Sequence, residues 1–197
     1  DAVAALVPAG PGRAVLDAGC GDGAHLAAVV ARTGCAGYGL DISVPAVEAA
    51  ARAHPELHWV VANADRFLPY AEASFATILS VTARVNAAEF RRVLRDDGSL
   101  VVVVPAADDL LELRAAVLGE GIARDRAERV IEACAPAFTL VRRECLRGRG
   151  LLDATTVGDV LTASYRGLRT SQRMRVATLG PLEVTCARDV LIFRAAG

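Results

Sequence analysis

The stretch VLDAGCGDGAHL, residues 15–26, decides the fold. Its apolar start runs into an acid, Asp17, and glycines then occupy positions 19, 21 and 23. Apolar residues return at helical spacing from Ala24 onward, so the stretch predicts a buried strand, a tight turn and a helix. Glycine permits such a turn, and the missing Cβ lets ligand atoms lie close to the backbone. We therefore expect a ligand at this turn.

Strands and helices alternate along the first 118 residues. Short apolar runs predict strands at 13–18, 37–41, 57–62, 75–81 and 99–104. Helical patterns predict helices at 23–32, 45–54, 86–95 and 110–118. This order is typical of an α/β protein with a doubly wound, Rossmann-like, mostly parallel sheet. No repeat, low-complexity stretch or linker divides the chain, and we expect a single domain over residues 1–197.

Composition excludes several classes of protein. A hydrophobic content of 53% with 23% charged residues indicates a folded globular chain. No apolar run reaches the roughly 18 to 20 residues that a membrane helix needs. The five cysteines form no C-x-x-C pair, so we expect reduced thiols, no metal site and a cytoplasmic protein. The chain begins with Asp1 instead of Met, which is compatible with a fragment of a longer product.

Positive charge is concentrated in one segment. Residues 1–138 carry 12 Arg against 18 acids, whereas residues 139–175 carry eight Arg against three acids. Arginine forks suit phosphate, so this segment predicts a face that binds RNA. The arginines of the predicted face are Arg142, Arg147, Arg149, Arg166 and Arg169. The alternative is an ordinary solvated surface in a chain that uses Arg in place of Lys.

Acids also follow the second and third predicted strands. Asp41 ends the second strand, where an acid can accept hydrogen bonds from ribose hydroxyls. Asp65 follows the third strand and can accept from an exocyclic adenine amine. Asp17 and Asp22 bring negative charge to the glycine turn, which suits a cationic ligand better than a pyrophosphate. These residues together indicate a nucleoside that carries an ammonium and a sulfonium group.

Three segments resemble motifs of the class I S-adenosylmethionine-dependent methyltransferases. They are LDAGCGDG, GLDIS and NADRFLPYAEASFATIL, and the resemblance spans residues 13–104. It implies that family's sheet, with an antiparallel last strand, and S-adenosyl-L-methionine as the cofactor. Carried over residue by residue, it places Asp17 near the amino group of the methionine part and Asp41 on the ribose. The other implied cofactor contacts are Gly19, Gly21 and Gly23 for the methionine part, Ile42, Ala64 and Asp65 for the adenine, and Ser80 for the methyl-transfer side.

A finer resemblance extends toward the carboxyl terminus. The segments PAADDLLELRAAVL, LVRRECLRG, DVLTASYRG and VTCARDVLIFRAAG are similar to the catalytic domain of the bacterial large-subunit ribosomal RNA (guanine-N1)-methyltransferases. In that family the start of the first helix also touches the cofactor, which adds His25 and Leu26 to the implied contacts. The family's amino-terminal zinc ribbon is absent from the printed sequence. This chain departs from the family's pattern at four further places. Ala24-His25 stands where the family has an aromatic pair, and residues 83–85 stand where it has an APC-like turn. Residues 163–165 replace an MTP sequence, and Asp109 replaces a histidine.

The predicted function is methyl transfer from S-adenosylmethionine to a nucleophile, with a guanine ring nitrogen of ribosomal RNA as the implied acceptor. The departures leave a small-molecule methyltransferase open. A nicotinamide-dependent reductase is another alternative, because Gly19-x-Gly21-x-x-Ala24 formally fits a dinucleotide fingerprint. A non-catalytic cofactor-binding module is the third. Spacing identifies no catalytic base.

Overall fold

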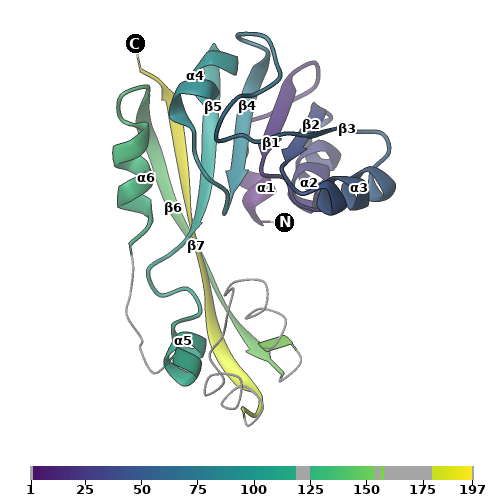
Figure 1. Cartoon of the computed structure of the whole chain (residues 1–197). Helices are drawn as coiled ribbons and strands as arrows, with labels where there is room; N and C mark the ends of the chain where they lie inside the picture. Colours follow the sequence, from purple (N-terminus) through teal and green to yellow (C-terminus); the bar gives the residue numbers. More distant parts are fainter. Residues whose placement is uncertain (1, 119–124, 154–155, 158–178, 197) are drawn as a thin grey trace. The chain divides into compact units, whose positions relative to one another are not determined.

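The computed structural model describes residues 2–118, 125–153, 156–157 and 179–196 (Figure 1). The chain divides into two compact units. Unit 1 comprises residues 1–104, 127–144 and 189–197, and unit 2 comprises residues 105–126 and 145–188. Two long strands, β6 (Phe138–Leu152) and β7 (Leu182–Ala195), contribute residues to both units. The expectation of a single domain stays a prediction.

Seven strands form one sheet in the order β3-β2-β1-β4-β5-β7-β6 (Figure 1). The first five are β1 (Ala14–Ala18), β2 (Ala36–Asp41), β3 (His58–Val61), β4 (Phe75–Val81) and β5 (Leu94–Pro105). Each of the pairs β1–β2, β1–β4, β2–β3 and β4–β5 is parallel. β7 runs opposite to its neighbours β5 and β6. The predicted doubly wound sheet with an antiparallel last strand is confirmed.

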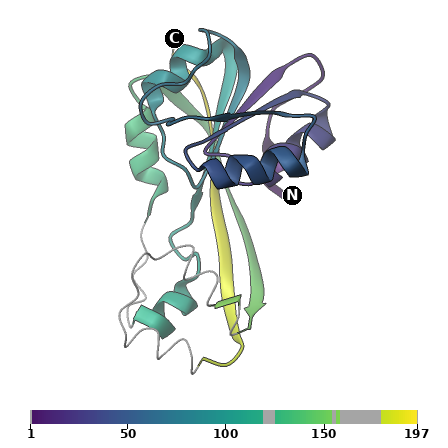
Figure 2. The same cartoon turned by 45° about the vertical axis from the view of Figure 1, so that its right-hand side comes forward.

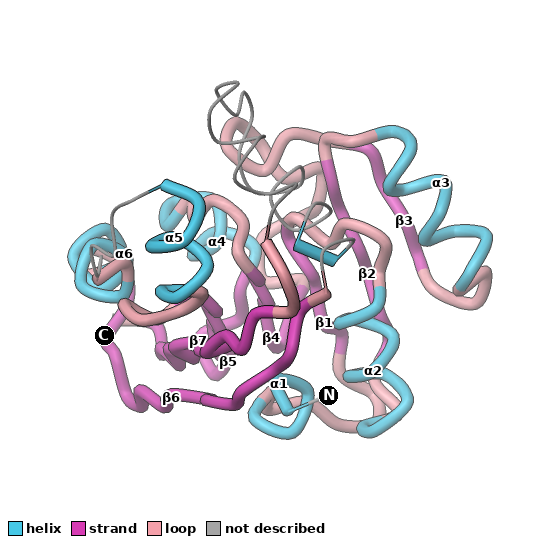
Figure 3. Tube along the Cα trace, turned by 90° about the horizontal axis from the view of Figure 1, so that it is seen from below, coloured by secondary structure: helices cyan, strands magenta, loops and turns pink. Residues whose placement is uncertain are grey.

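Helices cover both faces of the sheet in unit 1. The helices of this unit are α1 (Ala2–Leu6), α2 (Ala24–Thr33), α3 (Val44–Ala53), α4 (Ala87–Val93) and α6 (Ala127–Cys134). Figure 3 shows α1, α2 and α3 on one face, with α4 and α6 on the other. α3 packs on β2 and β3 at the edge of the sheet (Figure 2). None of the helices that the structure describes is long and apolar enough to cross a membrane.

Local sequence determines where two of these helices begin. The Ser43 hydroxyl accepts a hydrogen bond from the Ala46 N–H at the start of α3, where Pro45 occupies the first turn. The Asn86 side chain accepts from the Glu89 N–H in the same way at the start of α4. The predicted helix 86–95 instead ends at Val93, because Leu94 is extended and opens β5.

The core of unit 1 is built from the strands and the apolar faces of the helices. β4 is buried from Phe75 to Ser80, as a strand covered on both faces must be. Tyr38 and Tyr70 place their rings edge-on to Phe75, at 5.5 and 4.9 Å between ring centroids. Burying a side chain as large as Phe75 contributes about 1.5–3 kcal/mol. This core fixes the positions of the loops at the ends of the strands.

Unit 2 has a smaller core of its own around α5 (Leu111–Leu118). Leu113 and Val117 of this helix pack against Val157 and Val184. The buried Asp109 accepts a 2.9 Å hydrogen bond from the Ala187 N–H and pairs with the Arg188 guanidinium. Asp109 therefore has a structural role within this unit.

Candidate cofactor-binding site

The carboxyl ends of β1, β2, β3 and β4 meet at one edge of the sheet, because these strands are parallel. We call this edge, with the loops that follow the four strands, the carboxyl edge. Asp17 pairs in register with Gly39 of β2 and Leu79 of β4. Asp41 ends β2, and Ser80 is the penultimate residue of β4. Ligands of doubly wound sheets bind at such an edge.

The glycine turn, residues 19–23, has two tightly packed positions and one open position. Gly19 has a φ of +87°, and a Cβ there would lie 2.4 Å from the Ala83 Cβ. Gly23 has a φ of +82°, and a Cβ there would lie 2.3 Å from the Trp59 ring. At Gly21 a Cβ would meet nothing within 4 Å. Gly21 also has a positive φ, of +54°, so backbone conformation explains all three glycines, and a ligand has room to approach Gly21.

Asp41 connects β2 to the glycine turn. One of its carboxylate oxygens accepts a 3.0 Å hydrogen bond from the Gly21 N–H, and the other accepts a 2.8 Å bond from the Ser43 N–H. Each oxygen keeps one further lone pair, since a carboxylate can accept about four hydrogen bonds. Asp41 is therefore fixed in place and can still accept from two ligand hydroxyls.

Asp17 is a buried acid without a full set of partners. Its side chain is 1% exposed, and Oδ1 has no hydrogen-bond donor among the described residues. Burial raises the pKa of Asp17 to about 7, against a smaller lowering by His25 and a further raising by Asp41. A ligand ammonium group would supply both a donor and a compensating charge at this position.

Ser80 is the second buried polar residue at the carboxyl edge that lacks a partner. It is fully buried, and its Oγ has no hydrogen bond within the described part of the chain. Buried polar atoms are paired in nine cases out of ten or more, so each exception needs an explanation. A polar ligand at the carboxyl edge would give the Ser80 hydroxyl a partner.

The residues predicted to contact adenine follow β2 and β3. Ile42 is 67% exposed, which leaves its side chain available for an aromatic ring. The Asn63 side chain accepts a 2.9 Å bond from the Asp65 N–H. Asn86 donates to the carbonyls of Asp65 and Ala64, at 3.0 and 3.4 Å. The Ala64–Asp65 loop is thereby fixed from two sides.

Two other predicted contacts lie in the first turn of α2. The His25 side chain is half-buried and opposes, in part, the rise that burial causes in the pKa of Asp17. The Leu26 side chain is fully buried in the core. Leu26 can therefore reach a ligand through its backbone alone.

The structure adds residues to the site that the sequence reasoning missed. Trp59 and Ala83 pack against the glycine turn, and Asn86 tethers the adenine loop. Glu89 and Arg92 hold the chain just after that loop. The Glu89 carboxylate accepts from the Leu68 N–H at 2.8 Å and from Arg92 at 2.7 Å, and the Arg92 hydrogen bonds lower the pKa of Glu89 to about 2. A capping signature, Asn86 followed three residues later by Glu89, was the available signal.

A hollow of about 580 Å³ adjoins the adenine loop. It is lined by Asp65, Ala83, Arg84, Val85, Asn86, Ala87, Arg129, Val130 and Ala133. We call it the Arg84 hollow. All of its lining belongs to unit 1. Arg84 is 3.4 Å from the Asp65 carboxylate and has an 86% exposed side chain.

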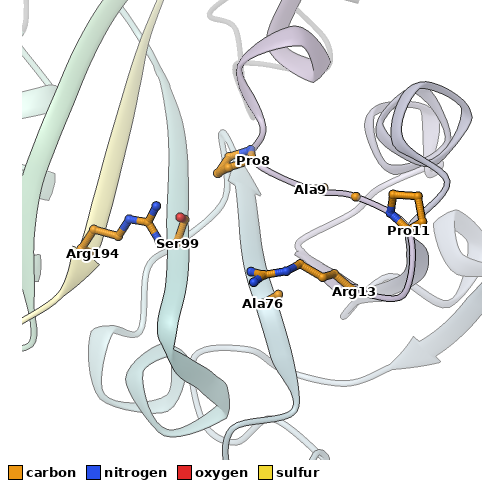
Figure 4. Close-up of a pocket in the computed structure, with 8 residues that line it drawn as sticks. Pro8, Ala9, Pro11, Arg13, Ala76, Ser99 and Arg194 are labelled. Atoms are coloured by element: carbon orange, nitrogen blue, oxygen red, sulfur yellow. The ribbon is translucent and has the colours of Figure 1, made fainter.

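A second hollow of about 310 Å³ lies at the opposite edge of the same sheet, where the strands begin (Figure 4). Arg13 and Arg194 extend toward one another from opposite sides of this amino-edge hollow. Both arginines already have partners. Arg13 pairs with Asp97 at 3.0 Å, and Arg194 donates to the backbone carbonyls of Asp97 and Gly98 at 2.6 and 3.3 Å.

The arginines of the predicted RNA-binding face that the structure describes each have an acidic neighbour. Arg142 pairs with Glu144 in unit 1. In unit 2, Arg147 pairs with Asp108 at 3.0 Å and Arg149 with Glu183 at 3.7 Å. Arg166 and Arg169 lie outside the described residues, as do residues 163–165. The face stays a prediction.

The cysteines and acids form no metal site among the described residues. No group of three or more His, Cys, Asp or Glu side chains there is arranged to hold a metal ion. All five cysteines are free thiols; Cys20, Cys35 and Cys134 are buried, and Cys145 and Cys186 are exposed.

Comparison with known proteins identifies the class of this domain. Residues 15–98 match the family model described as a methyltransferase domain. A Bacillus halodurans protein described provisionally as a methyltransferase superposes with a TM-score of 0.70 at 14% identity, over 98% of this chain and 96% of that chain. Geranyl diphosphate methyltransferase, in a complex with SAM, superposes with a TM-score of 0.63 at 18% identity, over 99% and 85%. The chain therefore carries a methyltransferase domain with the class I fold.

Sequence relatives are more specific. The 23S rRNA (guanine(748)-N(1))-methyltransferase of Streptomyces fradiae is 43% identical over 155 residues, which are 78% of this chain and 55% of the relative. A Micromonospora griseorubida protein, named provisionally as a 23S rRNA (guanine-N(1)-)-methyltransferase, is 50% identical over 100 residues, or 50% of this chain and 34% of the relative. The resemblance to this family is confirmed. The chain spans between about a third and just over half of these relatives' length.

Proposed function

We propose that the protein transfers a methyl group from S-adenosyl-L-methionine to a guanine ring nitrogen of ribosomal RNA. The observation that carries the proposal is the buried Asp17 Oδ1 atom, which has no donor among the described residues, together with the open backbone at Gly21 on the loop that follows. A cationic nucleoside with an amino group matches both features. The names of the relatives support the choice of reaction and acceptor.

The residues at the carboxyl edge fit the proposed cofactor. Asp17 would bind its ammonium group, and Asp41 would accept from its ribose hydroxyls. Ile42 would lie against the adenine face, with Asp65 accepting from the adenine amine. When bound, the cofactor supplies a methyl group activated by the adjacent sulfonium.

The chain's own contribution to the reaction is orientation. Holding the acceptor in line with the methyl group can lower the barrier by about 7–11 kcal/mol. Ser80 Oγ lies at the end of β4 with no partner in the described residues, so it is available to an acceptor or to the cofactor. Guanine N1 must also lose a proton, and we assign no side chain of this chain as its acceptor.

RNA is the proposed acceptor because the resemblance continues beyond the cofactor motifs into β6 and β7. The predicted face with Arg142, Arg147 and Arg149 supports the same choice. The free thiols support the predicted cytoplasmic location, where ribosomal RNA lies.

Two measurements test the proposal. Calorimetry with S-adenosylmethionine and with NADH would show which nucleotide binds, and NADH binding without the methyl donor would favour the reductase. Labelled methyl donor should then be offered with unmodified 23S ribosomal RNA and, separately, with a metabolite pool. Label on an N1-methylated guanosine supports the proposal, and label in metabolites alone contradicts it. Binding without methylation in either pool would favour a non-catalytic module.

A further inference from the structure

Two arginines line the Arg84 hollow with little to neutralise them. Among the described residues Arg84 pairs with the Asp65 carboxylate alone, at 3.4 Å, and its side chain is 86% exposed. Arg129, an exposed residue in the first turn of α6, has no hydrogen bond or ion pair with any residue that the structure describes. The lining therefore carries more positive than negative charge.

The amino-edge hollow provides the internal comparison. It too is lined by two arginines, but Arg13 is paired with Asp97 and Arg194 is bound to two backbone carbonyls. Those contacts explain why the two arginines are there. In the part of the chain that the structure describes, no contact of this kind explains Arg129, and the one ion pair of Arg84 is with a residue of the predicted adenine site.

The Arg84 hollow begins at the place where methyl transfer is expected. Ala83, which belongs to its lining, lies against the Gly19 position of the glycine turn. Ala83 follows Ser80 by three residues and is the second residue after the end of β4. The hollow then extends through Asn86 to Arg129 of α6. If an acceptor base reaches Ser80, the parts of the acceptor molecule next to that base would lie in this hollow.

We propose that Arg84 and Arg129 bind backbone phosphates of the RNA next to the target guanine. The inference rests on the proposed function and adds to it a phosphate-binding subsite in unit 1, formed by two arginines that do not belong to the predicted arginine face. Arginine suits this role because its planar guanidinium can donate two parallel hydrogen bonds to a phosphate. Phosphate contacts position a polynucleotide, and the base contacts made elsewhere specify it.

Exposure favours a polynucleotide over a small phosphorylated substrate. Sites for small ligands bury 70–90% or more of the ligand surface. Arg84 is almost fully exposed, so a small phosphate bound there would stay largely in water. A polynucleotide can use such an exposed contact because its target base is bound at a second position on the protein. The shared chemistry is a phosphate ester, and the test separates its two sources.

The experiment compares Arg84→Ala, Arg129→Ala and the double variant with the unchanged chain. Arg52→Ala is the matched control, because Arg52 is an exposed arginine on α3 whose contact is with Glu48 on the same helix. RNA methylation is measured as kcat and KM at several salt concentrations, and cofactor affinity is measured in parallel. Thermal unfolding checks that each variant is folded.

We expect KM for RNA to rise about tenfold in each single variant, as for the loss of a charge-assisted hydrogen bond of about 1.4 kcal/mol. Cofactor affinity should stay unchanged in Arg129→Ala, and KM should stay unchanged in Arg52→Ala. Each lost phosphate contact should also reduce the log–log salt slope of RNA binding by about 0.7 on single strands. Arg129→Lys should retain most of the slope.

An RNA KM and a salt slope that stay unchanged in the double variant, in a preparation that methylates RNA, would overturn the inference and leave the proposed function intact. Methylation of guanosine monophosphate that depends on Arg129 would overturn the polynucleotide assignment. Label in metabolites without phosphate, and none in RNA, would overturn the proposed function itself.

Discussion

The buried hydroxyl groups near the two ends of β4 differ in their hydrogen bonding. Thr77, near the start of the strand, is 1% exposed and donates a hydrogen bond to the Pro8 carbonyl. Ser80, near the end of the strand, is fully buried and has no partner among the described residues. One strand therefore carries one polar group that serves the fold and another that the fold alone does not explain.

The same contrast holds for charged groups. At the amino edge, Arg13 is bound to Asp97 of β5, and Arg194 is bound to the backbone carbonyls of Asp97 and Gly98. At the carboxyl edge, Asp17 is buried with one oxygen that has no donor among the described residues, and burial raises its pKa to about 7. An unsatisfied buried group destabilises a protein, so the unpaired Asp17 oxygen is best explained by a ligand. The difference between the edges, more than either hollow, indicates where the site is.

The largest expected effect is the pH dependence of stability through Asp17. Its pKa is raised in the folded protein from 3.8 to about 7, so folding favours the protonated acid. The stability that this group contributes is fully present below pH 4 and is lost as the pH rises through 7, by up to about 4 kcal/mol at 1.36 kcal/mol per unit. Urea unfolding of the ligand-free chain between pH 4 and 8 measures this loss. Asp17→Asn should abolish it, and equal pH profiles for the two chains would contradict the assignment.

The methyl donor should reverse that pH dependence, because its ammonium group favours the ionised form of Asp17. Affinity should therefore rise as the pH passes through about 7, with a proton released on binding below that pH. Calorimetry in buffers with different ionisation enthalpies would detect the released proton.

The next effect is on cofactor affinity at Asp41. Asp41→Ala should weaken S-adenosylmethionine binding by about 1–3 kcal/mol, through the loss of charge-assisted hydrogen bonds to the ribose. Asp97→Ala is the control at the amino edge and should leave the affinity unchanged. Equal affinities for the Asp41 variant and the unchanged chain would remove the ribose assignment.

A third prediction compares the two hydroxyl groups of β4 directly. Thr77→Val should lower the free energy of unfolding by about 1–3 kcal/mol, because the Pro8 carbonyl loses its donor. Ser80→Ala should leave the stability of the ligand-free chain within about 0.5 kcal/mol, because no hydrogen bond is lost. Ser80→Ala should change cofactor binding or turnover instead. Similar unfolding free energies for the two variants would contradict the claim that Thr77 stabilises the fold and Ser80 does not.

The sequence predicted much of the site because its signals are local. β4 was predicted with its observed bounds, 75–81, from an uninterrupted apolar run. The glycine turn was predicted from three alternating glycines, and Asp41 from its place at the end of a strand. The observed Gly21 N–H to Asp41 hydrogen bond brings those two features together.

The rest depends on contacts between distant segments, which spacing does not reveal. Trp59 fills the space beside Gly23, and Ala83 fills the space beside Gly19, across 36 and 64 residues of chain. The helix predicted at 86–95 stops at Val93, because sheet pairing of Leu94 with Phe75 prevails over a helix-forming local sequence. α1 and α6 were not predicted at all.

The smallest expected effect concerns the tether of the adenine loop. The Asn86 side chain has two separable functions, since its oxygen caps α4 while its nitrogen donates to the Asp65 and Ala64 carbonyls. Asn86→Asp keeps the capping oxygen and replaces the donor by an acceptor. We expect stability to stay within about 0.5 kcal/mol, because acids are favoured at helix starts. The affinity for the methyl donor should fall by only about 0.5–1 kcal/mol, the net contribution of a hydrogen bond that orients the loop.

Asn86→Ala completes this test, because it removes both functions and should also destabilise the chain by about 1 kcal/mol through the lost cap. Calorimetric affinity and urea unfolding, measured on both variants, separate the two contributions. If Asn86→Asp binds the methyl donor as the unchanged chain does, the Ala64–Asp65 loop does not need its tether. The adenine assignment of Asp65 would then depend on the Asn63 hydrogen bond alone. The affinity for the methyl donor could instead fall while the free energy of unfolding stays unchanged. The Asn86 amide nitrogen would then contribute to ligand binding and not to the fold, in contrast to the Thr77 hydroxyl.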